Sequence, residues 1–299
     1  MMLKNFGQME QFVREQSGKK RVALAAAHDA DALGSLMMAV DRGIAEAILI
    51  GRRKEIVRVL DEMGKDAGDF RIIEEEDDRA AADKAVELVH RGEADMPMKG
   101  LMHTSTFMKA ILDKEKGLKE DGNLLSQASV FEIPEKDRFL IISDCAVNID
   151  PDLETKIKIT ENAAALAHTL GIEQPKIAVL SAVEVVNPKI RSTVDAAAMR
   201  ERLSDRYLID GPLALDNAID EAAARHKGIE SPVAGNADIL IVPDLWSGNI
   251  FSKGLVFFAH LRSAGTLNGL KAPVVMSSRT DTVENKYLSI LTAVLQTIR

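Results

Sequence analysis

The chain alternates short apolar runs with longer amphipathic stretches, and this alternation restricts its possible folds more than any other feature. The runs are only a few residues long and rich in β-branched side chains, as is typical of strands buried on both faces of a sheet. Such strands alternating with helices predict an α/β protein whose sheets are largely parallel. The expected strands are Arg21–Ala26, Ala47–Ile50, Phe70–Ile73, Phe139–Ile142, Lys176–Leu180, Asp238–Val242 and Pro273–Met276.

Three of the intervening stretches have a helical pattern and are followed by glycine, the usual residue after the last turn of a helix. They are Asp31–Arg42, Asp78–Arg91 and Asp152–Leu170. A chain of 299 residues is longer than one hydrophobic core usually supports, so two domains are expected. Two polar, glycine-bearing segments, Gly117–Asn123 and Ser263–Lys271, are the candidate boundaries.

The composition argues against several classes of function. The net charge is −8, and the few aromatic residues do not interleave with basic ones, so a nucleic-acid surface is not expected. Cys145 is the only cysteine, which excludes an internal disulfide and fits a reducing compartment. The N-terminal stretch is not a signal peptide, and no run approaches the ~20 apolar residues that span a bilayer. We therefore expect a soluble cytoplasmic protein without a membrane partner.

The common catalytic motifs are missing. The sequence contains no G-x-G-x-x-G, no G-x-x-x-x-G-K-[ST] and no G-x-S-x-G. Its six histidines are scattered and none forms H-E-x-x-H, which argues against a zinc hydrolase. The usual nucleotide-binding folds and the usual hydrolases are therefore not supported.

Ligands of parallel α/β sheets bind beyond the carboxyl ends of strands, and two of the four candidate stretches lie in the first half of the chain. In Ala26–Asp31, His28 and Asp29 could face a ligand, or an aspartate could simply cap the next helix. In Met96–Ser105, Lys99 precedes a glycine and a helix start at His103, an arrangement suited to an anion. The alternative there is an exposed lysine with Thr104 or Ser105 as the N-cap.

The other two stretches lie near the C-terminus. In Asp238–Gly254, Asn249 and Lys253 are four residues apart on one helical face, although Asn249 could also be a cap. After the last expected strand, Asp281 and Glu284 have the spacing of a capping box, with Asp281 as N-cap and Glu284 at the third helical position. Arg279 could then simply pair with one of these carboxylates. A cap does not require Ser278 or Arg279, however, so a substrate site is the other interpretation of this stretch.

With these stretches in view, the sequence resembles the phosphate acetyl/butyryl transferase family from about Ala26 to the C-terminus. Several matching strings are long and specific, and "VEVVNPKI" and "DGPLALDNA" favour the butyryl over the acetyl branch. The string "MKGLMHTS" matches more loosely. The longer matching segments are Ser143–Lys156, Ser181–Ala197, Asp210–Ile219, His226–Asp244, Gly248–Leu255 and Ser277–Lys286.

The resemblance implies a fold and a reaction. The fold is two α/β domains with an interdomain cleft, in the three-layer architecture of isocitrate and isopropylmalate dehydrogenases. Residues 1–138 and 272–299 would form the first domain and residues 139–271 the second, with Ser278–Glu284 at the cleft floor. The reaction is acyl-CoA + phosphate ⇌ acyl phosphate + CoA, so acyl-CoA and phosphate are the expected partners, without metal or cofactor. A homodimer or larger homo-oligomer is also implied.

Acyl transfer to phosphate gives the last stretch specific roles. Arg279 would grip the phosphate, because a planar guanidinium binds it with two hydrogen bonds. Ser278 would donate to the developing oxyanion or to the thiol sulfur. Asp281 or Glu284 would take the proton of the CoA thiol. The supposed base aspartate of the acetyl branch falls near Glu284–Asn285, and Asn285 cannot act as a base, so both carboxylates remain candidates.

Further residues are expected to line the cleft and to hold oxygens of CoA or phosphate. Cys145 lies in a matching string, but a lone cysteine beside a buried strand is expected to be inert packing. The residues expected to bind substrate are Lys99, His103, Thr104, Asn249 and Lys253.

Three alternatives to a butyryl-transferring enzyme follow from the same residues. A phosphate acetyltransferase would differ in the size of its acyl pocket, which one sequence does not show. A non-catalytic relative would bind CoA or acyl phosphate as a sensor or scaffold, although the complete Ser-Arg-x-Asp set favours an enzyme. A fold-related dehydrogenase would need a nicotinamide site and a cluster of metal-binding aspartates, and neither is identifiable.

Overall fold

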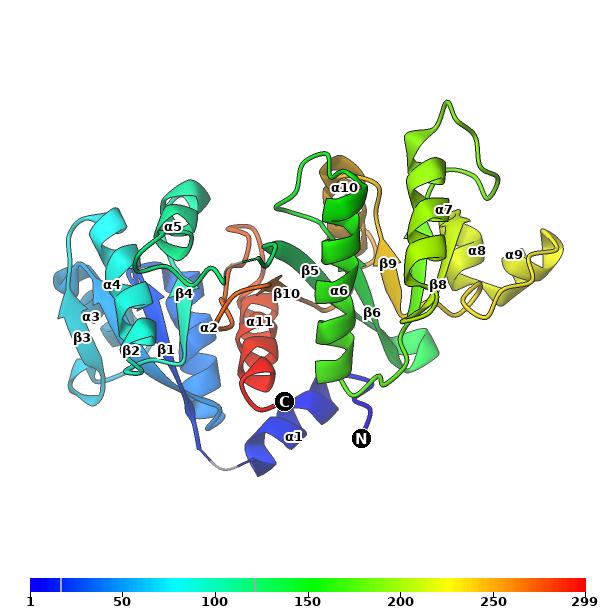
Figure 1. Cartoon of the computed structure of the whole chain (residues 1–299). Coiled ribbons are helices and arrows are strands. Elements are labelled where there is room, and N and C mark those ends of the chain that lie inside the picture. The colour runs from blue at the N-terminus through cyan, green and yellow to red at the C-terminus, as the bar shows by residue number, and fades with distance from the viewer. Residues whose placement is uncertain (17, 121) are drawn as a thin grey trace. The chain divides into compact units, whose positions relative to one another are not determined.

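The computed structural model describes residues 1–16, 18–120 and 122–299 (Figure 1). It contains two compact α/β units, and the expected α/β class is confirmed. We call Met1–Asn5 with Leu124–Ser263 the central unit, and Phe6–Asn123 with Ala264–Arg299 the terminal unit. Within the expected boundary segment Gly117–Asn123, Asp121 lies outside the described residues.

The chain passes between the units at residues 5/6, which the sequence analysis did not expect, and at 123/124 and 263/264, where the sequence analysis placed the boundaries at 138/139 and 271/272. The first difference arises from a β-hairpin. Strand β5 (Ser126–Ile133) pairs antiparallel with β6 (Arg138–Ser143), and the short 3₁₀ helix η2 (Pro134–Lys136) connects them. Residues 126–133 therefore fold with β6 rather than with the strands before them. At the second boundary, the chain leaves the central unit within β10 (Ser263–Asn268).

The terminal unit is built on a parallel sheet with the strand order β3-β2-β1-β4. Helix α2 contacts β2, α3 contacts β2 and β3, and α4 contacts β1, β4 and β2. The elements before the chain leaves this unit are α1 (Phe6–Glu15), β1 (Lys20–Ala25), α2 (Ala30–Asp41), β2 (Ala45–Gly51), α3 (Arg53–Glu62), η1 (Ala67–Asp69), β3 (Arg71–Glu74), α4 (Asp78–His90), β4 (Met96–Lys99) and α5 (Thr104–Ile111).

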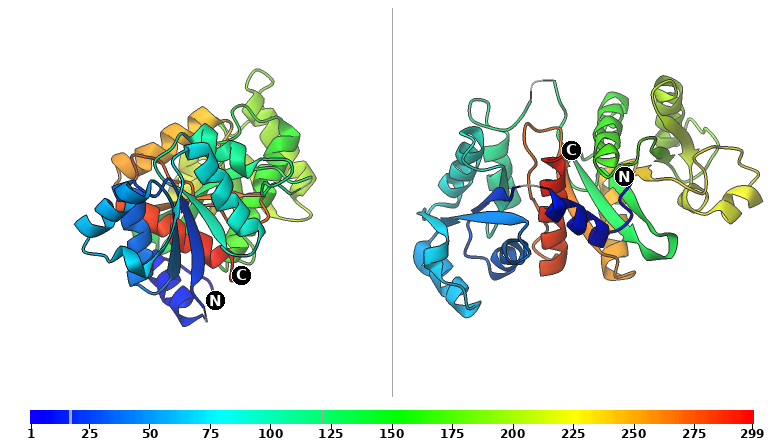
Figure 2. Two further views of the ribbon diagram at one scale, coloured as in Figure 1. Left: turned by 90° about the vertical axis from the view of Figure 1, so that its left-hand side faces the viewer. Right: turned by 90° about the horizontal axis from the view of Figure 1, so that it is seen from below.

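The last helix, α11 (Val283–Gln296), completes the terminal unit. Most of its side chains are buried, and it packs against α2 and α1. Figure 2 shows α11 in red beside α1 in dark blue. The apolar sequence from Tyr287 to Leu295 explains this burial, because a helix that is apolar on most of its faces must be covered by other elements. Thus the C-terminal residues belong to the core of the terminal unit.

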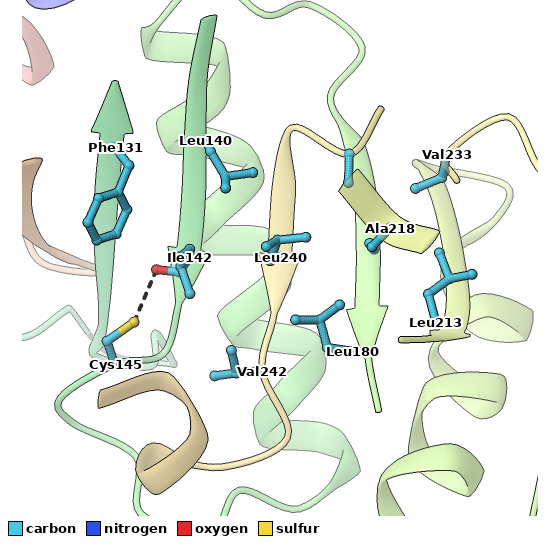
Figure 3. Packing of buried hydrophobic residues seen from close by; sticks show 12 residues of the cluster. Phe131, Leu140, Ile142, Cys145, Leu180, Leu213, Ala218, Val233, Leu240 and Val242 are labelled. Carbon is cyan, nitrogen blue, oxygen red and sulfur yellow. Dashed lines mark hydrogen bonds between the residues drawn. The ribbon is translucent and has the colours of Figure 1, made fainter. Parts of the chain in front are cut away.

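The central unit contains a mixed sheet, in which β5 is antiparallel to β6 and the strands continue in the order β5-β6-β9-β7-β8. A cluster that includes Phe131, Leu180 and Leu240 forms its core against this sheet (Figure 3). The elements after β6 are α6 (Leu153–Thr169), β7 (Lys176–Leu180), α7 (Arg191–Leu203), β8 (Leu208–Leu213), α8 (Leu215–Ile219), α9 (Glu221–His226), β9 (Ile239–Ile241) and α10 (Leu245–Phe257).

One expected strand is wrong. Residues 273–276 form only isolated bridges, in which Val275 pairs with Met98 and Val274 pairs with Leu267. Pro273 has no N–H group to donate, so the segment cannot extend a regular ladder in that direction. The remaining expected strands are present, with ends that differ by at most two residues. No helix in the described part of the chain combines the length and apolarity needed to cross a membrane.

The three expected helices are also present, and their ends have a common design. Asp29, Asp77 and Asp152 are the N-caps of α2, α4 and α6, and each carboxylate accepts hydrogen bonds from first-turn amides. The glycines that follow these helices have positive φ angles of 74° at Gly43, 69° at Gly92 and 82° at Gly171, which glycine adopts without steric cost.

Gly100 lies where the ends of β1 and β4 come closest. Its amide donates to the carbonyl of Ala25 at 2.8 Å, and the next amide donates to the carbonyl of Ala26. A Cβ atom at this position would lie 2.6 Å from the carbonyl oxygen of Ala25 and still closer to that of Ala26. Only glycine therefore allows the turn after β4 to lie against the end of β1.

We expect Gly100→Ala to lower the free energy of unfolding by about 1–3 kcal/mol, because two backbone segments must separate. Denaturant unfolding checks this. The matched control is Gly34→Ala within α2, where the new Cβ would meet only side-chain atoms at 3.5 Å or more, and which should be neutral or stabilising. Equal stability of both variants would contradict the steric interpretation.

Candidate functional site

The strand order of the terminal unit identifies one edge of its sheet as the candidate site. Successive crossovers place β2 and β3 on one side of β1, and the chain then crosses to place β4 on the other side. Ligands of open α/β sheets bind at such a switch point, beyond the carboxyl ends of the strands. The last paired residues of β1 and β4 are Ala25 and Lys99. The amide of Lys99 also donates to the carbonyl of Val275, so residues 276–282 emerge beside the same edge.

Lys99 is a buried cation at this switch point. Its Nζ donates to the carbonyl oxygens of Gly100 at 3.2 Å and Met102 at 3.3 Å. Burial lowers the pKa of this ammonium, the positive charges of Arg279 and Lys286 lower it further, and the Asp29 carboxylate acts in the opposite direction. The alternative of an exposed lysine is therefore wrong, and Lys99 lies near two other cations.

Lys286 is a second buried cation, and the sequence analysis did not identify it. It lies in the first turns of α11, and its Nζ donates to the carbonyl oxygens of Arg279 and Asp281. We call Lys99, Arg279 and Lys286 the cation cluster. Among the described residues, no member of the cluster forms an ion pair with a carboxylate. Buried charges without counterions are costly, so this cluster is suited to binding an anion.

Arg279 is the exposed member of the cation cluster. Its Nη2 lies 3.4 Å from Nδ1 of His103, and the guanidinium donates in this contact because it has no acceptor. His103 occupies the N-cap position of α5 but makes no capping hydrogen bond with its side chain. The alternative in which Thr104 or Ser105 caps this helix is therefore wrong, since both lie inside its first turn. The structure thus brings Lys99, His103, Thr104 and Arg279 to one edge.

Ser278 and Asp281 form a tight turn in front of α11. The amide of Ser278 donates to Oδ2 of Asp281 at 2.7 Å, and the amide of Asp281 donates back to the carbonyl of Ser278 at 3.2 Å. The hydroxyl of Ser278 is exposed and lies 3.1 Å from that of Thr280. This turn presents Ser278 and Arg279 outward while their backbone is fixed.

The expected capping box is wrong. The N-cap of α11 is Thr282, whose Oγ1 accepts from the amide of Asn285 at 3.1 Å. Glu284 is consequently the second residue of the helix and not the third, and its side chain is exposed. Asp281 lies one residue before the N-cap, and its carboxylate accepts from the Ser278 amide and not from an amide of the helix.

The two remaining predicted residues, Asn249 and Lys253, belong to α10 of the central unit. Nδ2 of Asn249 donates to the carbonyl of Cys145 at 3.2 Å, and Lys253 is exposed. The N-cap of α10 is Asp244, whose carboxylate accepts from Ser247, so the alternative of an Asn249 cap is wrong. Asn249 anchors the helix to the loop after β6.

Comparison with known proteins identifies the family of this chain. The model of the phosphate acetyl/butaryl transferase family matches residues 79–294, more than half of the chain. The chain belongs to this family. It is 45% identical to the phosphate butyryltransferase of Clostridium acetobutylicum, with 98% of each chain covered. It is 42% identical to the phosphate acetyltransferase of Thermotoga maritima, with 94% of this chain and 97% of the relative covered.

A solved structure of the family supports the fold. The crystal structure of a branched-chain phosphotransacylase from Enterococcus faecalis superimposes with a TM-score of 0.83 and 35% sequence identity, covering 93% of this chain and 98% of the other. The three-layer α/β architecture expected from the resemblance is therefore confirmed. The family match begins in α4 and ends within α11. The matched segment therefore includes Lys99, Arg279 and Lys286.

Cys145 lies in the loop after β6, where its Sγ contacts the carbonyl of Ile142 at 3.5 Å (Figure 3). Burial, and secondarily the charge of Asp144, raise the pKa of this thiol to about 12. Only the thiolate is a good nucleophile, and burial keeps this thiol protonated. This chemistry fits packing and does not fit nucleophilic catalysis.

We expect Cys145 to resist alkylation in the folded protein. Iodoacetamide at pH 8 should leave native protein unmodified over a time in which urea-unfolded protein is fully labelled, with mass spectrometry as the measurement. The unfolded sample controls for reagent quality. Equal labelling rates in both samples would show that the thiol is exposed and ionisable.

Proposed function

We propose that this protein transfers a short-chain acyl group between CoA and inorganic phosphate: butyryl-CoA + phosphate ⇌ butyryl phosphate + CoA. The observation that carries the proposal is the cation cluster at the switch point, in a chain of the phosphate acetyl/butaryl transferase family. Phosphate or the phosphoryl group of the acyl phosphate supplies the missing negative charge. In the forward direction a phosphate oxygen forms a bond to the acyl carbon, and the bond from that carbon to the CoA sulfur breaks.

Each residue at this edge has a proposed task. Arg279 binds two oxygens of phosphate, and the fixed turn beneath it limits the entropy lost on binding. Ser278 donates its exposed hydroxyl to the carbonyl oxygen, on which negative charge develops in the transition state. Lys99 and Lys286 hold the turns after β4 and before α11 and maintain the positive field. His103 and Thr104 flank the phosphate from the start of α5.

The remaining predicted contacts and requirements are part of the same proposal. Asn249 and Lys253 are proposed contacts for oxygens of CoA. Self-association into a homodimer or larger homo-oligomer is included, as the resemblance implies. A cytoplasmic location and the lack of a metal or cofactor requirement stay predictions.

Acetyl-CoA is the second candidate substrate. The identity to the Thermotoga maritima phosphate acetyltransferase, 42%, is nearly as high as the 45% to the butyryltransferase, so overall similarity does not separate the two acyl groups. Steady-state rates with acyl-CoAs of two to six carbons, measured with a thiol reagent, decide between them. Highest kcat/KM with the four-carbon chain would support the butyryl assignment, and highest kcat/KM with acetyl-CoA would replace it.

We expect Arg279→Ala to lower kcat/KM for phosphate by about 10- to 150-fold, because the loss of a hydrogen bond to a charged group costs about 1.5–3 kcal/mol. Arg279→Lys keeps the charge but loses the planar fork, so an intermediate rate is expected. Phosphate-dependent release of CoA thiol is the measurement.

The matched control for these variants is Arg58→Ala, which removes an exposed arginine paired with Glu62 on α3. It should leave the rate unchanged, and all three variants should have the melting temperature of the wild type. A wild-type rate in Arg279→Ala would remove this residue from the site. No phosphate-dependent thiol release from any acyl-CoA would refute the enzymatic function and favour a non-catalytic binding protein.

Glu284 is the carboxylate that we propose as the general base for the CoA thiol. Asp281 already accepts the Ser278 amide and thereby orders the turn, whereas Glu284 is exposed at the start of α11. The resemblance also places the family base near residues 284–285. On this proposal Asp281 positions Ser278 and Arg279 and does not itself take the proton.

Two isosteric variants separate these roles. In the direction from butyryl phosphate and CoA to butyryl-CoA, in which the thiol loses its proton, Glu284→Gln should lower kcat by about 10²–10⁴-fold and change the dependence of the rate on pH. Asp281→Asn keeps an oxygen acceptor for the Ser278 amide, so kcat should stay within about tenfold of wild type, with an unchanged pH profile. The opposite pattern in the two pH profiles would assign the base to Asp281.

A further inference from the structure

His28 is a buried side chain at the switch point, and the proposed reaction assigns it no task. It follows β1 directly, in the first of the four candidate stretches (β1 in Figure 1). The residue is only 9% exposed. Buried polar side chains normally have hydrogen-bond partners, so the two ring nitrogens of His28 should each have one.

The turn that carries His28 is held from two sides. The amide of Ala27 donates to the carbonyl of Ile50 at 3.0 Å, and the carbonyl of Ala26 accepts from the amide of Leu101 at 3.1 Å. Ala26 has a φ angle of 53°, which is uncommon for a residue with a Cβ. Such conformations persist only where the surroundings impose them, and they are frequent at functional sites.

One ring nitrogen of His28 is enclosed by protein. Nδ1 is inaccessible to solvent and has no hydrogen-bond partner in the described part of the chain. It faces Gly51 at the end of β2, where a Cβ atom would lie 3.3 Å from it. Gly51 has no side chain that could supply a partner, so this side of the ring offers no polar contact.

The other ring nitrogen is open to a ligand. Nε2 of His28 also forms no hydrogen bond with the residues that the structure describes, but unlike Nδ1 it is not enclosed. An enclosed N–H group without an acceptor is costly, so in the neutral ring the proton belongs on Nε2. The ring therefore presents a single N–H donor on its open side.

The turn after β1 lies close to the cation cluster. The amides of Gly100 and Leu101, which follow Lys99, both donate to carbonyls at the end of β1 and in this turn. The carboxylate of Asp29, the residue after His28, raises the pKa of the Lys99 ammonium against the effect of burial. An anion bound at the cation cluster is thus a neighbour of the turn that carries His28.

The backbone at this turn leaves the imidazole as a donor for such an anion. Oδ1 of Asp29 accepts from the amides of Asp31 at 2.9 Å and Ala32 at 3.2 Å, so these first-turn amides of α2 are already used. Asp29 itself can only accept hydrogen bonds from its neighbours while it is ionised. The Nε2–H group of His28 is free of both restrictions.

We propose that Nε2 of His28 donates a hydrogen bond to an oxygen of the phosphate bound at the cation cluster. A phosphate has more acceptor positions than the two that Arg279 fills, and a donor from a second strand end fixes its orientation toward the acyl carbon. The identity of the anion rests on the proposed function. The inference adds to it a neutral donor that belongs to the β1 turn rather than to the cluster.

Binding of inorganic phosphate tests the contact without any acyl-CoA. We expect His28→Phe, which keeps a ring and removes the donor, to raise the dissociation constant of phosphate in isothermal titration by about 10- to 150-fold, as expected for the loss of a hydrogen bond to a charged group. In the acyl-transfer assay the same variant should raise KM for phosphate and leave KM for acyl-CoA unchanged.

Two further variants separate the donor from the volume of the ring. His28→Gln places an amide nitrogen at the distance of Nε2 and should recover part of the affinity, whereas His28→Asn reaches only as far as Nδ1 and should not. The matched control is His90→Phe, at an exposed histidine that ends α4 in the same unit, and it should bind phosphate as the wild type does.

Nuclear magnetic resonance of the wild type, labelled with ¹⁵N-histidine, tests the tautomer even where a variant fails to fold. The protonated and the bare nitrogen of a neutral imidazole have well-separated ¹⁵N shifts. We expect the His28 ring to carry its proton on Nε2, and we expect phosphate to shift this signal. The signal that is missing in His28→Gln identifies the residue.

Four outcomes would overturn the proposal. They are a wild type that binds no phosphate at millimolar concentration, unchanged phosphate affinity in His28→Phe, a proton on Nδ1, and an Nε2 signal that phosphate does not shift. These measurements need no turnover. A protein that binds phosphate through His28 but releases no CoA thiol would therefore refute the acyl transfer and leave the contact in place.

Discussion

The candidate site depends on positive charge that no carboxylate in the described part of the chain pairs with. Lys99 and Lys286 are both buried, and each ammonium is held by backbone carbonyl oxygens rather than by a carboxylate. Carbonyl dipoles keep an ammonium hydrogen-bonded without cancelling its charge. The two lysines thereby tie together the turns after β4 and before α11 and leave their field available to an anion. Arg279, exposed between them, is the group that can make direct contact with that anion.

The features that could be predicted from the sequence are those that residues close together in the chain determine. Asp29, Asp77 and Asp152 cap helices, and glycines follow them, because capping needs only a short polar side chain and a residue that tolerates positive φ. Lys99 and His103 are near each other in the sequence, so their shared place in the turn after β4 was also predictable. The approach of Arg279 to His103 joins residues 176 positions apart and therefore depends on contacts between distant segments.

The sequence analysis differs from the structure at features that contacts between distant residues determine. The boundary between the units lies before β5 and not before β6, because β5 pairs with β6. The mixed sequence "SQASVFEI" of β5 did not indicate a strand. The apolar residues 273–276 looked like a strand but make single bridges on either side. Lys286 was missed because a lysine in the first turns of a helix normally points to water. Its burial follows from the position of the turn whose carbonyls it binds.

The N-cap of α11 was predicted wrongly because the sequence does not show which of two suitable neighbouring side chains caps the helix. Asp281 and Thr282 are adjacent, and both residue types are good N-caps, so the helix could begin after either one. In the structure the Ser278 amide takes the carboxylate of Asp281, and the helix amide is left to the hydroxyl of Thr282. The stronger acceptor is thus used to fix the turn that carries Ser278 and Arg279, and the weaker one caps the helix. The Ser278–Asp281 turn and the start of α11 therefore use different side chains, and the competition between the two acceptors is resolved only by the backbone geometry of the turn.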